Sequence, residues 1–259
     1  MDYDVVIVGG GPSGLSAAIK LAQLFKEKKQ EKSICVLEKS AEIGGHILSG
    51  NVFETTALDE LIPDWKEKNA PLNVPVKKDA IKFLLNDKLS IPVPSFLMPT
   101  MKNHGNYIIS LANLCRWLAE QAESLGVDIF PGFPAAEIIY KEGKVAGVIT
   151  GDMGKDSKGN EKDSFQPGME IFANESTVFA EGCRGNLGKQ LIKKFELDKG
   201  KDPQHYGIGF KEIWEVDNEH HSEGLVMHTN GWPLPDDTPG GSYMYHAENK
   251  QVLLGLVVP

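Results

Sequence analysis

The residues with the clearest chemistry are three glycines near the start of the 259-residue chain, Gly9, Gly11 and Gly14. They follow a short apolar run and precede a segment whose apolar residues have helical spacing. In this pattern the first glycine permits a tight turn, the second lets a pyrophosphate approach the backbone, and the third lets a helix pack closely on a sheet. The amides at the helix N-terminus then face the phosphates, because the helix dipole favours negative charge there. We therefore expect a dinucleotide site.

A carboxylate at the end of the next apolar run extends this prediction. That run is SICVLEK, residues 33–39, and its Glu38 follows Gly14 by 24 positions. An acidic residue at about this spacing accepts hydrogen bonds from ribose hydroxyls and repels a 2′-phosphate, which argues against NADP. The alternative is a glycine-rich turn with a surface glutamate nearby by chance. The matching strand, turn, helix and carboxylate argue against that alternative.

Small residues after Glu38 bear on the kind of dinucleotide. Two stretches follow, Gly44-Gly45 and Ser49-Gly50, and they suit a bulky tricyclic ring and its ribityl chain passing close to the backbone. A second strand, glycine turn and helix lies in residues 176–195, and it fits a long dinucleotide held along its length. The pattern favours FAD. The predicted cofactor-binding residues on these segments are Gly9, Gly11, Pro12, Ser13, Gly14, Glu38, Lys39, Gly44, Gly45, His46, Ser49, Gly50, Glu181 and Gly182.

In a flavin enzyme the cofactor supplies the difficult chemistry, so no catalytic nucleophile and no metal ligand are expected. The chain's three cysteines, Cys35, Cys115 and Cys183, form no Cys-x-x-Cys pair, which argues against zinc or iron–sulfur ligation by this chain alone. Cys35 and Cys115 are expected to be buried as small hydrophobic residues. His46 and His104 are candidate proton donors because imidazole titrates near neutrality, and a structural hydrogen bond is the alternative for each.

An apolar loop stands out from an acidic chain. Residues 91–101, IPVPSFLMPTM, contain three prolines and no charge. The loop is too short to span a bilayer, which takes about 20 apolar residues, and its prolines exclude a regular helix. It is either folded into the interior or in contact with an apolar partner through Phe96, Leu97 and Met98. The net charge of −9 argues against nucleic acid as a partner.

Three further segments complete the outline. Residues 110–125 have apolar side chains at helical spacing and end at Gly126, which predicts an amphipathic helix. Residues 151–168 are rich in Gly, Asp, Lys and Ser, which predicts an exposed loop between strands. The last residues, KQVLLGLVVP, indicate a buried strand that stops at Pro259. We therefore expect the chain to be a fragment of a longer protein.

Several long motifs point to one family: DVVIVGGGPSGLSAAI, EIGGHILSG, PDWKEKNAPLN, NHGNYIISLANLCRWLAEQAESLGVDIFPGF, GDMG, FAEGCRGNLGKQL and GGSYMYH. Through them the chain resembles the electron-transfer flavoprotein–ubiquinone oxidoreductases over essentially its whole length. The resemblance implies an α/β fold, in which a Rossmann-like FAD-binding domain of the glutathione-reductase type carries an inserted mixed-sheet quinone-binding domain. The implied bounds are 1–80 and 105–200 for the FAD-binding domain, 81–104 for a loop region near membrane and quinone, and 201–259 for part of the quinone-binding domain.

Members of this family hold FAD and a [4Fe-4S] cluster, accept electrons from electron-transfer flavoprotein and reduce ubiquinone in the membrane. The resemblance implies the same activity here, with the cluster only in a C-terminal part beyond this chain. It also implies a peripheral position on the inner mitochondrial or bacterial cytoplasmic membrane, and a quinone headgroup near Gly240 and Gly241. Arg116 is implied to lie near the FAD phosphates, with a solvated charge as the alternative. Glu181 stands where the wider flavoprotein branch carries Asp, and it keeps an acceptor for the ribityl chain.

Two other functions remain open at this point. One is a flavoprotein similar to geranylgeranyl reductases or aromatic hydroxylases, acting on another apolar substrate. The other is a truncated binding module that holds FAD and transfers no electrons.

Overall fold

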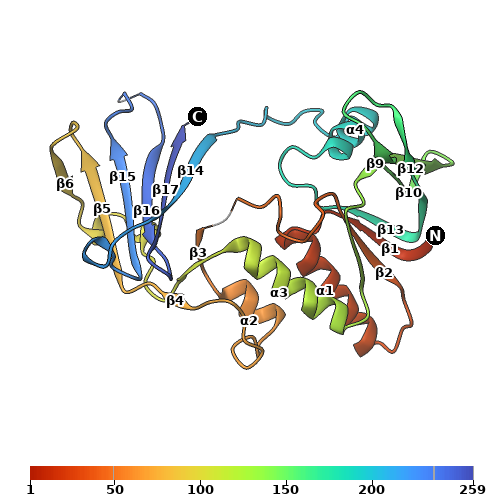
Figure 1. Ribbon diagram of the computed structural model, residues 1–259, viewed down its shortest axis with the longest axis horizontal. Helices are drawn as coiled ribbons and strands as arrows, with labels where there is room; N and C mark the ends of the chain where they lie inside the picture. The colour runs from red at the N-terminus through yellow and green to blue at the C-terminus, as the bar shows by residue number, and fades with distance from the viewer. Residues whose placement is uncertain (49, 236, 259) are drawn as a thin grey trace. The chain divides into compact units, whose positions relative to one another are not determined.

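The computed structural model describes residues 1–48, 50–235 and 237–258 (Figure 1). The chain divides into two compact units, and each of them takes two segments of the sequence. Unit 1 consists of Met1–Ile47 and Cys115–Asp202, and unit 2 of Leu48–Leu114 and Pro203–Pro259. The domain bounds given above remain a prediction.

Unit 1 is built on a six-stranded sheet with the strand order β8-β2-β1-β13-β10-β9. Its parallel strands are β1 (Asp2–Val8), β2 (Ile34–Glu38), β8 (Asp128–Pro131) and β13 (Glu170–Phe179). An antiparallel hairpin of β9 (Ala135–Lys141) and β10 (Lys144–Thr150) extends the sheet. Its helices are α1 (Pro12–Glu27), α4 (Asn186–Phe195) and most of α3 (Leu111–Ser124). The predicted first two strands and the predicted helix 110–125 are confirmed.

The core of unit 1 explains the unbroken apolar runs at residues 5–8 of β1 and 34–37 of β2. Both strands lie in the middle of a parallel sheet, where side chains on both faces are buried. Helix α1 covers the sheet with a stripe at helical spacing that includes Leu15, Ala18 and Ile19. Cys35 and Cys115 are buried, and burial is the main cause that raises the pKa of each thiol to about 12. The expectation that both are buried small residues is confirmed.

The polar segment 151–168 differs from the prediction of a loop. It contains a two-stranded hairpin of β11 (Met153–Lys155) and β12 (Glu161–Gln166). The tip of the hairpin is closed by Asp156, whose side chain accepts hydrogen bonds from the backbone amides of Lys158 and Asn160. The hairpin could not be predicted from the sequence, because its two strands are almost wholly exposed. Exposed strands lack the alternation of apolar and polar residues that marks a half-buried strand.

Unit 2 contains a six-stranded mixed sheet with the order β14-β17-β16-β15-β5-β6. The strands are β5 (Lys78–Leu84), β6 (Ser90–Pro92), β14 (Ile208–Glu215), β15 (Leu225–Gly231), β16 (Gly241–His246) and β17 (Gln251–Val258). Only β15 and β5 pair in parallel among these described strands. The strand expected at the chain's end is confirmed as β17. A smaller sheet of β3 (Asn51–Phe53), β4 (Val74–Pro75) and β7 (Tyr107–Ile109), together with helix α2 (Thr56–Leu61), completes the unit.

One face of the large sheet in unit 2 forms the core of that unit, and we call it the inner face. It buries Val226, Tyr245 and Leu253 against Val74 and Ile108 of the smaller sheet. Because side chains alternate between the two faces of a sheet, the strand register identifies the other residues whose side chains lie on this face.

The apolar loop between β6 and β7 lies on the surface of unit 2. It contains two short 3-10 helices, Ser95–Leu97 and Pro99–Met101. The Phe96 side chain is 73% exposed and that of Leu97 is 62% exposed, so the alternative of a loop folded into the interior is wrong for these two residues. Met98 is half-buried. In the described part of the chain, no helix is long and apolar enough to cross a membrane.

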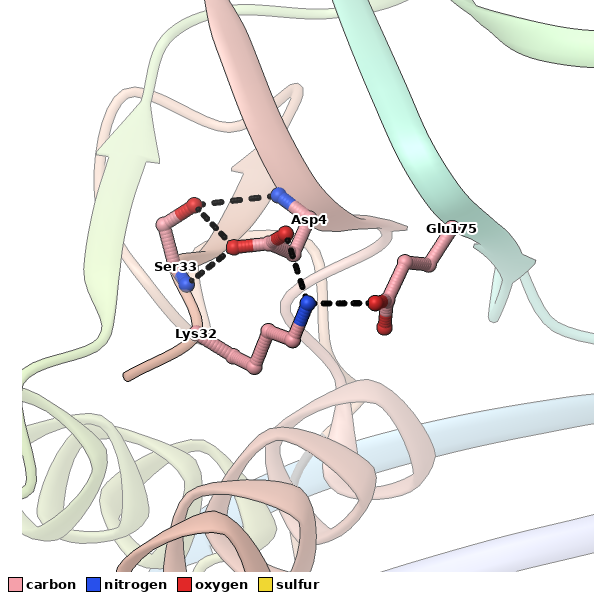
Figure 2. Close-up of polar contacts among 4 residues, drawn as sticks. All are labelled: Asp4, Lys32, Ser33 and Glu175. Atoms are coloured by element: carbon pink, nitrogen blue, oxygen red, sulfur yellow. Dashed lines mark hydrogen bonds and ion pairs between the residues drawn. The ribbon is translucent and has the colours of Figure 1, made fainter. Parts of the chain in front are cut away.

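A polar cluster fastens the starts of β1 and β2 to the middle of β13 (Figure 2). Asp4 Oδ2 accepts hydrogen bonds from the backbone amide and the hydroxyl of Ser33, at 2.8 and 3.0 Å. Lys32 Nζ lies 3.4 Å from Asp4 Oδ1 and 2.5 Å from Glu175 Oε1. The Ser33 backbone amide is the main cause that lowers the pKa of Asp4. The cluster therefore links three strands at the edge of the sheet where β1 and β2 begin.

Replacing Asp4 with Ala removes the acceptor that holds Ser33 and Lys32, so the midpoint of thermal unfolding should fall. Nucleotide affinity should be unchanged, because the glycine-rich turn lies at the opposite end of β1. Thermal melts and a nucleotide titration check both expectations, with the exposed Asp2→Ala as the matched control. An equal midpoint for the two variants would show that the cluster does not fasten the strands.

Candidate functional site

The glycine-rich turn is shaped by contacts of the backbone with itself. Gly9 has a φ of +110°, and a Cβ added to it would lie 2.4 Å from the carbonyl oxygen of Ala180. A Cβ on Gly14 would lie 2.0 Å from the carbonyl oxygen of Gly9. These two glycines are therefore required for the close approach of β1, α1 and the turn after β13.

Gly11 differs from its two neighbours in the motif. Its φ of −82° suits any residue, and a Cβ added to it would meet no atom within 4 Å. The protein's own packing thus gives no reason for a glycine here. Open space beside backbone amides is what a bound pyrophosphate needs, and this position provides it.

Helix α1 leaves its N-terminal amides available. Its N-cap is Gly11, which has no side chain to accept from them, and Pro12 occupies the first turn, where its missing N–H costs nothing. In the described part of the chain, no side chain accepts a hydrogen bond from the amides of Ser13 or Gly14. The positive end of the helix dipole adds to these free donors. The turn is therefore suited to a phosphate group.

A cavity of about 680 Å³ in unit 1 opens beside this turn. It extends past the end of β2 to the stretch Gly44–Ile47, and to the turn that follows β13. This volume lies within the ordinary range for cofactor pockets, roughly 300–1,000 Å³. Its lining includes ten predicted residues, namely Gly9, Gly11, Pro12, Ser13, Glu38, Lys39, Gly44, His46, Glu181 and Gly182.

Glu38 is held rigidly at the rim of this cavity. Its Oε2 accepts from the backbone amide of Gly10 at 2.9 Å, and its Oε1 accepts from the amide of Ser40 at 2.8 Å. A carboxylate offers about four acceptor positions, so two bonds leave room for further donors. The side chain is thus fixed in place and still able to accept hydrogen bonds from ribose hydroxyls.

Glu181 lies in the turn after β13 and binds the start of α4. Its Oε1 accepts from the amide of Leu187 at 3.2 Å and its Oε2 from the amide of Gly188 at 2.8 Å. A Cβ on Gly185 would lie 2.6 Å from the Cβ of Glu181, so the glycine makes room for this side chain. The structure therefore gives Glu181 a role that the sequence did not reveal: it caps a helix while it lines the cavity.

Four other predicted residues do not line the cavity. Gly14 lies behind the turn, and Gly45 packs close to the Ser40 hydroxyl. Arg116 Nη2 forms an exposed ion pair with Glu42 Oε1 at 3.0 Å, and its predicted position near the FAD phosphates remains a prediction. Gly50 lies in unit 2, where its carbonyl accepts from Lys211 Nζ. Ser49 lies outside the described residues.

Sequence reasoning missed part of the cavity lining. Arg184 and Asn186 follow Glu181 within the quoted motif FAEGCRGNLGKQL, so their position in that motif was an available signal. Pro134 and Ala135 enter from the start of β9, and the local sequence carries no signal for them. Of the two candidate proton donors, His46 lines the cavity, whereas His104 is exposed on unit 2.

The glycine pair in unit 2 also has a packing explanation. A Cβ on Gly240 would lie 2.5 Å from the carbonyl oxygen of Val257, and one on Gly241 would lie 2.3 Å from that of Thr229. The pair therefore lets β16 begin close to β17 and β15. A contact with a quinone at this pair remains a prediction.

Comparison with known proteins gives the same reading of both units. The family model described as "ETF-QO, ubiquinone-binding" matches residues 206–259, and the one described as "NAD(P)-binding Rossmann-like domain" matches residues 7–62. The electron transfer flavoprotein-ubiquinone oxidoreductase of Pseudomonas aeruginosa is 59% identical over 261 residues, which cover 100% of this chain and 47% of the relative. The resemblance inferred from the sequence is confirmed.

Mitochondrial electron transfer flavoprotein-ubiquinone oxidoreductases are similar as well. That of Mus musculus is 50% identical, with 99% of this chain and 42% of the relative covered. That of Arabidopsis thaliana is 50% identical, with 100% of this chain and 40% of the relative covered. The chain therefore spans less than half the length of these electron transfer flavoprotein-ubiquinone oxidoreductases.

Solved structures share the fold at low sequence identity. A flavoprotein/dehydrogenase from Cytophaga hutchinsonii has a TM-score of 0.65 at 18% identity, with 100% of this chain and 56% of that chain covered. A geranylgeranyl bacteriochlorophyll reductase-like protein from Thermoplasma acidophilum has a TM-score of 0.64 at 18% identity, with 99% and 56% covered. At this identity the likeness shows the fold alone, and it confirms the predicted fold class.

Substitution of Gly11 by Asn should separate ligand binding from folding. Asn is a good N-cap, so the unfolding midpoint should hold, while its side chain fills the space left for a phosphate. FAD affinity should fall at least about tenfold, as expected for the loss of one charge-assisted hydrogen bond. The contrasting Gly14→Ala should lose about 1–3 kcal/mol of stability, as overpacking does. Equal FAD affinity of wild type and Gly11→Asn, measured by fluorescence titration, would contradict a phosphate site here.

Glu181 gives a second test of the cavity's construction. Glu181→Ala should lower the free energy of unfolding by about 1 kcal/mol, because two amides at the start of α4 lose their acceptor. Glu181→Gln keeps one acceptor oxygen and should lose less. Urea unfolding of both variants checks the order. If both variants match the wild type in stability, Glu181 does not act as a helix cap.

Proposed function

We propose that the full-length protein is an FAD-dependent electron-transferring-flavoprotein dehydrogenase that passes electrons from electron-transfer flavoprotein to membrane ubiquinone. The observation that carries the proposal is the open cradle at Gly11, in a chain similar over its whole length to proteins named for this activity. The chain covers less than half of those relatives, so their activity is assigned to it here as a proposal.

The residues of unit 1 fit FAD. The phosphates would lie on the amides of α1, and the adenosine ribose would lie against Glu38. The cavity continues from there along Gly44–Ile47 and the turn after β13, as a molecule longer than one nucleotide requires. When bound, FAD exchanges electrons singly or in pairs, which links one-electron carriers to two-electron quinone reduction. The protein's own residues bind and orient the cofactor.

Unit 2 is proposed to hold the quinone headgroup. The match of residues 206–259 to a family described by ubiquinone binding supports this assignment. We place the headgroup beside the start of β16, near Gly240 and Gly241. The carbonyl of Gly240 already accepts from Asn230 Nδ2 at 2.9 Å, so the backbone there is fixed. A [4Fe-4S] cluster is proposed only for a part beyond this chain, because Cys35, Cys115 and Cys183 are widely spaced and form no Cys-x-x-Cys pair.

The exposed apolar loop is proposed to contact the membrane that holds the substrate. Phe96 and Leu97 project from a segment stiffened by three prolines, and Met98 adjoins them. Burial of an apolar side chain of this size contributes about 1.5–3 kcal/mol, so the loop can bind to a bilayer without spanning it. Lys102 and His104, which are both exposed, lie where they can face lipid headgroups. The proposed location is peripheral, on the inner mitochondrial or bacterial cytoplasmic membrane.

The second candidate function is that of a flavoprotein similar to geranylgeranyl reductases or aromatic hydroxylases, which acts on another apolar substrate. Its support is the fold shared with a geranylgeranyl bacteriochlorophyll reductase-like protein at 18% identity, and such a likeness carries no substrate information. The relatives with 50–59% identity are named for ubiquinone reduction, which favours the first proposal.

The purified chain, supplied with FAD, should show flavin absorption close to one flavin per chain. After reduction, its flavin should be reoxidised faster when a short-chain, water-soluble ubiquinone is added than in buffer alone. Stopped-flow absorbance measures both rates under anaerobic conditions. If the chain bound no flavin, the result would contradict the proposed function and would support a module without redox activity. Bound flavin with no response to ubiquinone would support another apolar substrate.

Replacing Phe96 and Leu97 together with Ser should weaken binding to phosphatidylcholine vesicles by about a hundredfold, from the loss of roughly 1.5 kcal/mol at each position. The matched control is Leu197→Ser, which removes another apolar side chain of similar exposure from unit 1. Sedimentation with vesicles gives the bound fraction. The membrane assignment fails if the double variant sediments as the wild type does.

A further inference from the structure

Lys211 is a cation on the inner face of the large sheet in unit 2. It pairs with Gly255 of β17, and two residues further on Ile213 pairs with Leu253, which belongs to the core of the unit. Since side chains alternate along a strand, Lys211 shares the face of Leu253. Its side chain is half-buried. A lysine in this position is unusual, because an ammonium group favours water unless a partner compensates.

The ammonium group of Lys211 has a limited set of partners. Its Nζ donates a hydrogen bond to the carbonyl oxygen of Gly50 and lies 5.6 Å from the ring centroid of Tyr243. Across the described residues, no carboxylate lies within ion-pair distance of it. An ammonium has three N–H donors, and the Gly50 contact uses one of them. Two donors and a full positive charge therefore remain for another acceptor.

The aromatic ring beside Lys211 is fixed in place. The ring of Tyr243 lies across the backbone of Gly255, where an added Cβ would be 2.1 Å from its Cζ. It also stacks on Tyr245, with centroids 4.6 Å apart and planes 19° from parallel. Tyr245 is held in turn by His228, whose Nε2 lies 2.9 Å from the tyrosine oxygen. A cation and a rigid ring thus form one wall of the inner face.

This wall adjoins the proposed quinone position. Gly241 and Tyr243 are two residues apart on β16, so they lie on the same face about 7 Å apart along the strand. Lys211 is half-buried and so has lost part of its hydration, and this burial lowers its pKa. A charge with less water around it acts more strongly on a neighbouring charge.

We propose that Lys211 binds a carbonyl oxygen of the quinone headgroup and stabilises the negative charge that this oxygen gains during reduction. The inference rests on the proposed function and deepens it, because it names the residue that meets the acceptor. Conversion of a quinone to a quinol adds two electrons and two protons. The electrons come from the reduced flavin of the proposed function, and the protons come from that flavin or from water. Lys211 is unchanged at the end of the reaction.

A purely structural role is the alternative, in which Lys211 only ties Gly50 to the sheet. Three substitutions separate the two roles. Lys211→Gln can still donate to the Gly50 carbonyl and lacks the charge. Lys211→Arg keeps both the charge and donors. Lys211→Met loses both. The matched control is Lys78→Met on β5, an exposed lysine that alternation places on the opposite face of the same sheet.

The test measures the dissociation constant of a short-chain, water-soluble ubiquinone for the FAD-loaded chain, by quenching of intrinsic fluorescence. Lys211→Gln and Lys211→Met should both bind about tenfold more weakly than wild type, as expected for the loss of a charged hydrogen-bond donor. Lys211→Arg should bind within about threefold of wild type. Lys78→Met should match wild type. Melting curves of each variant show whether it is folded.

Three results would overturn the inference. The first is wild-type affinity in Lys211→Gln, which would leave only the tether to Gly50. The second is weakened binding in Lys78→Met equal to that in Lys211→Met, which would reflect overall charge. The third is unchanged ubiquinone affinity with a shifted flavin reduction potential, measured by spectroelectrochemistry, which would assign the charge to the flavin. If wild type itself neither binds nor reduces ubiquinone, the proposed function fails along with the inference.

Discussion

The structure of unit 1 depends on one constraint, the contact of backbone with backbone at the glycine-rich turn. Gly9 faces the carbonyl of Ala180, and Gly14 faces the carbonyl of Gly9, at distances that admit no side chain. These contacts hold β1, α1 and the turn after β13 in one arrangement. The glycine-rich turn beside the cavity therefore takes its shape from main-chain atoms, so the amides that face a bound diphosphate would be held in place without help from a side chain.

The carboxylates of Glu38 and Glu181 line the cavity, and each accepts hydrogen bonds from a different set of backbone amides. Glu181 accepts from the amides at the start of α4, so that helix end is neutralised by the protein itself. Glu38 accepts from Gly10 and Ser40 and keeps its own place at the end of β2. The start of α1 has no comparable acceptor among the described residues. The start of α1 therefore keeps both free amides and the positive end of a helix dipole, and a negatively charged diphosphate is expected to bind there.

The sequence predicted most of unit 1 because its signals are local. The glycine spacing, the apolar strands and Glu38 lie within 40 residues and define a single supersecondary unit. The role of Glu181 as a helix cap was not predictable, since it depends on the space that Gly185 leaves for the glutamate side chain. The lining by Pro134 and Ala135 was hidden because it arises from strand order, and the exposed hairpin in 151–168 was hidden because it lacks an apolar face.

In unit 2 the residues that suggest an acceptor site from the sequence differ from the residue that suggests one from the structure. Gly240 and Gly241 attract attention in the sequence, yet the close approach of Val257 and Thr229 already requires them. Lys211 does not stand out in the sequence, because a single lysine in an acidic chain resembles any other solvated charge. Only the register of β14 and β17 reveals that it faces inward beside Tyr243. A half-buried cation without a carboxylate partner in the described structure is energetically unfavourable unless another acceptor compensates for the water it has lost. The physical case for an acceptor site in unit 2 therefore rests more firmly on Lys211 than on the glycine pair.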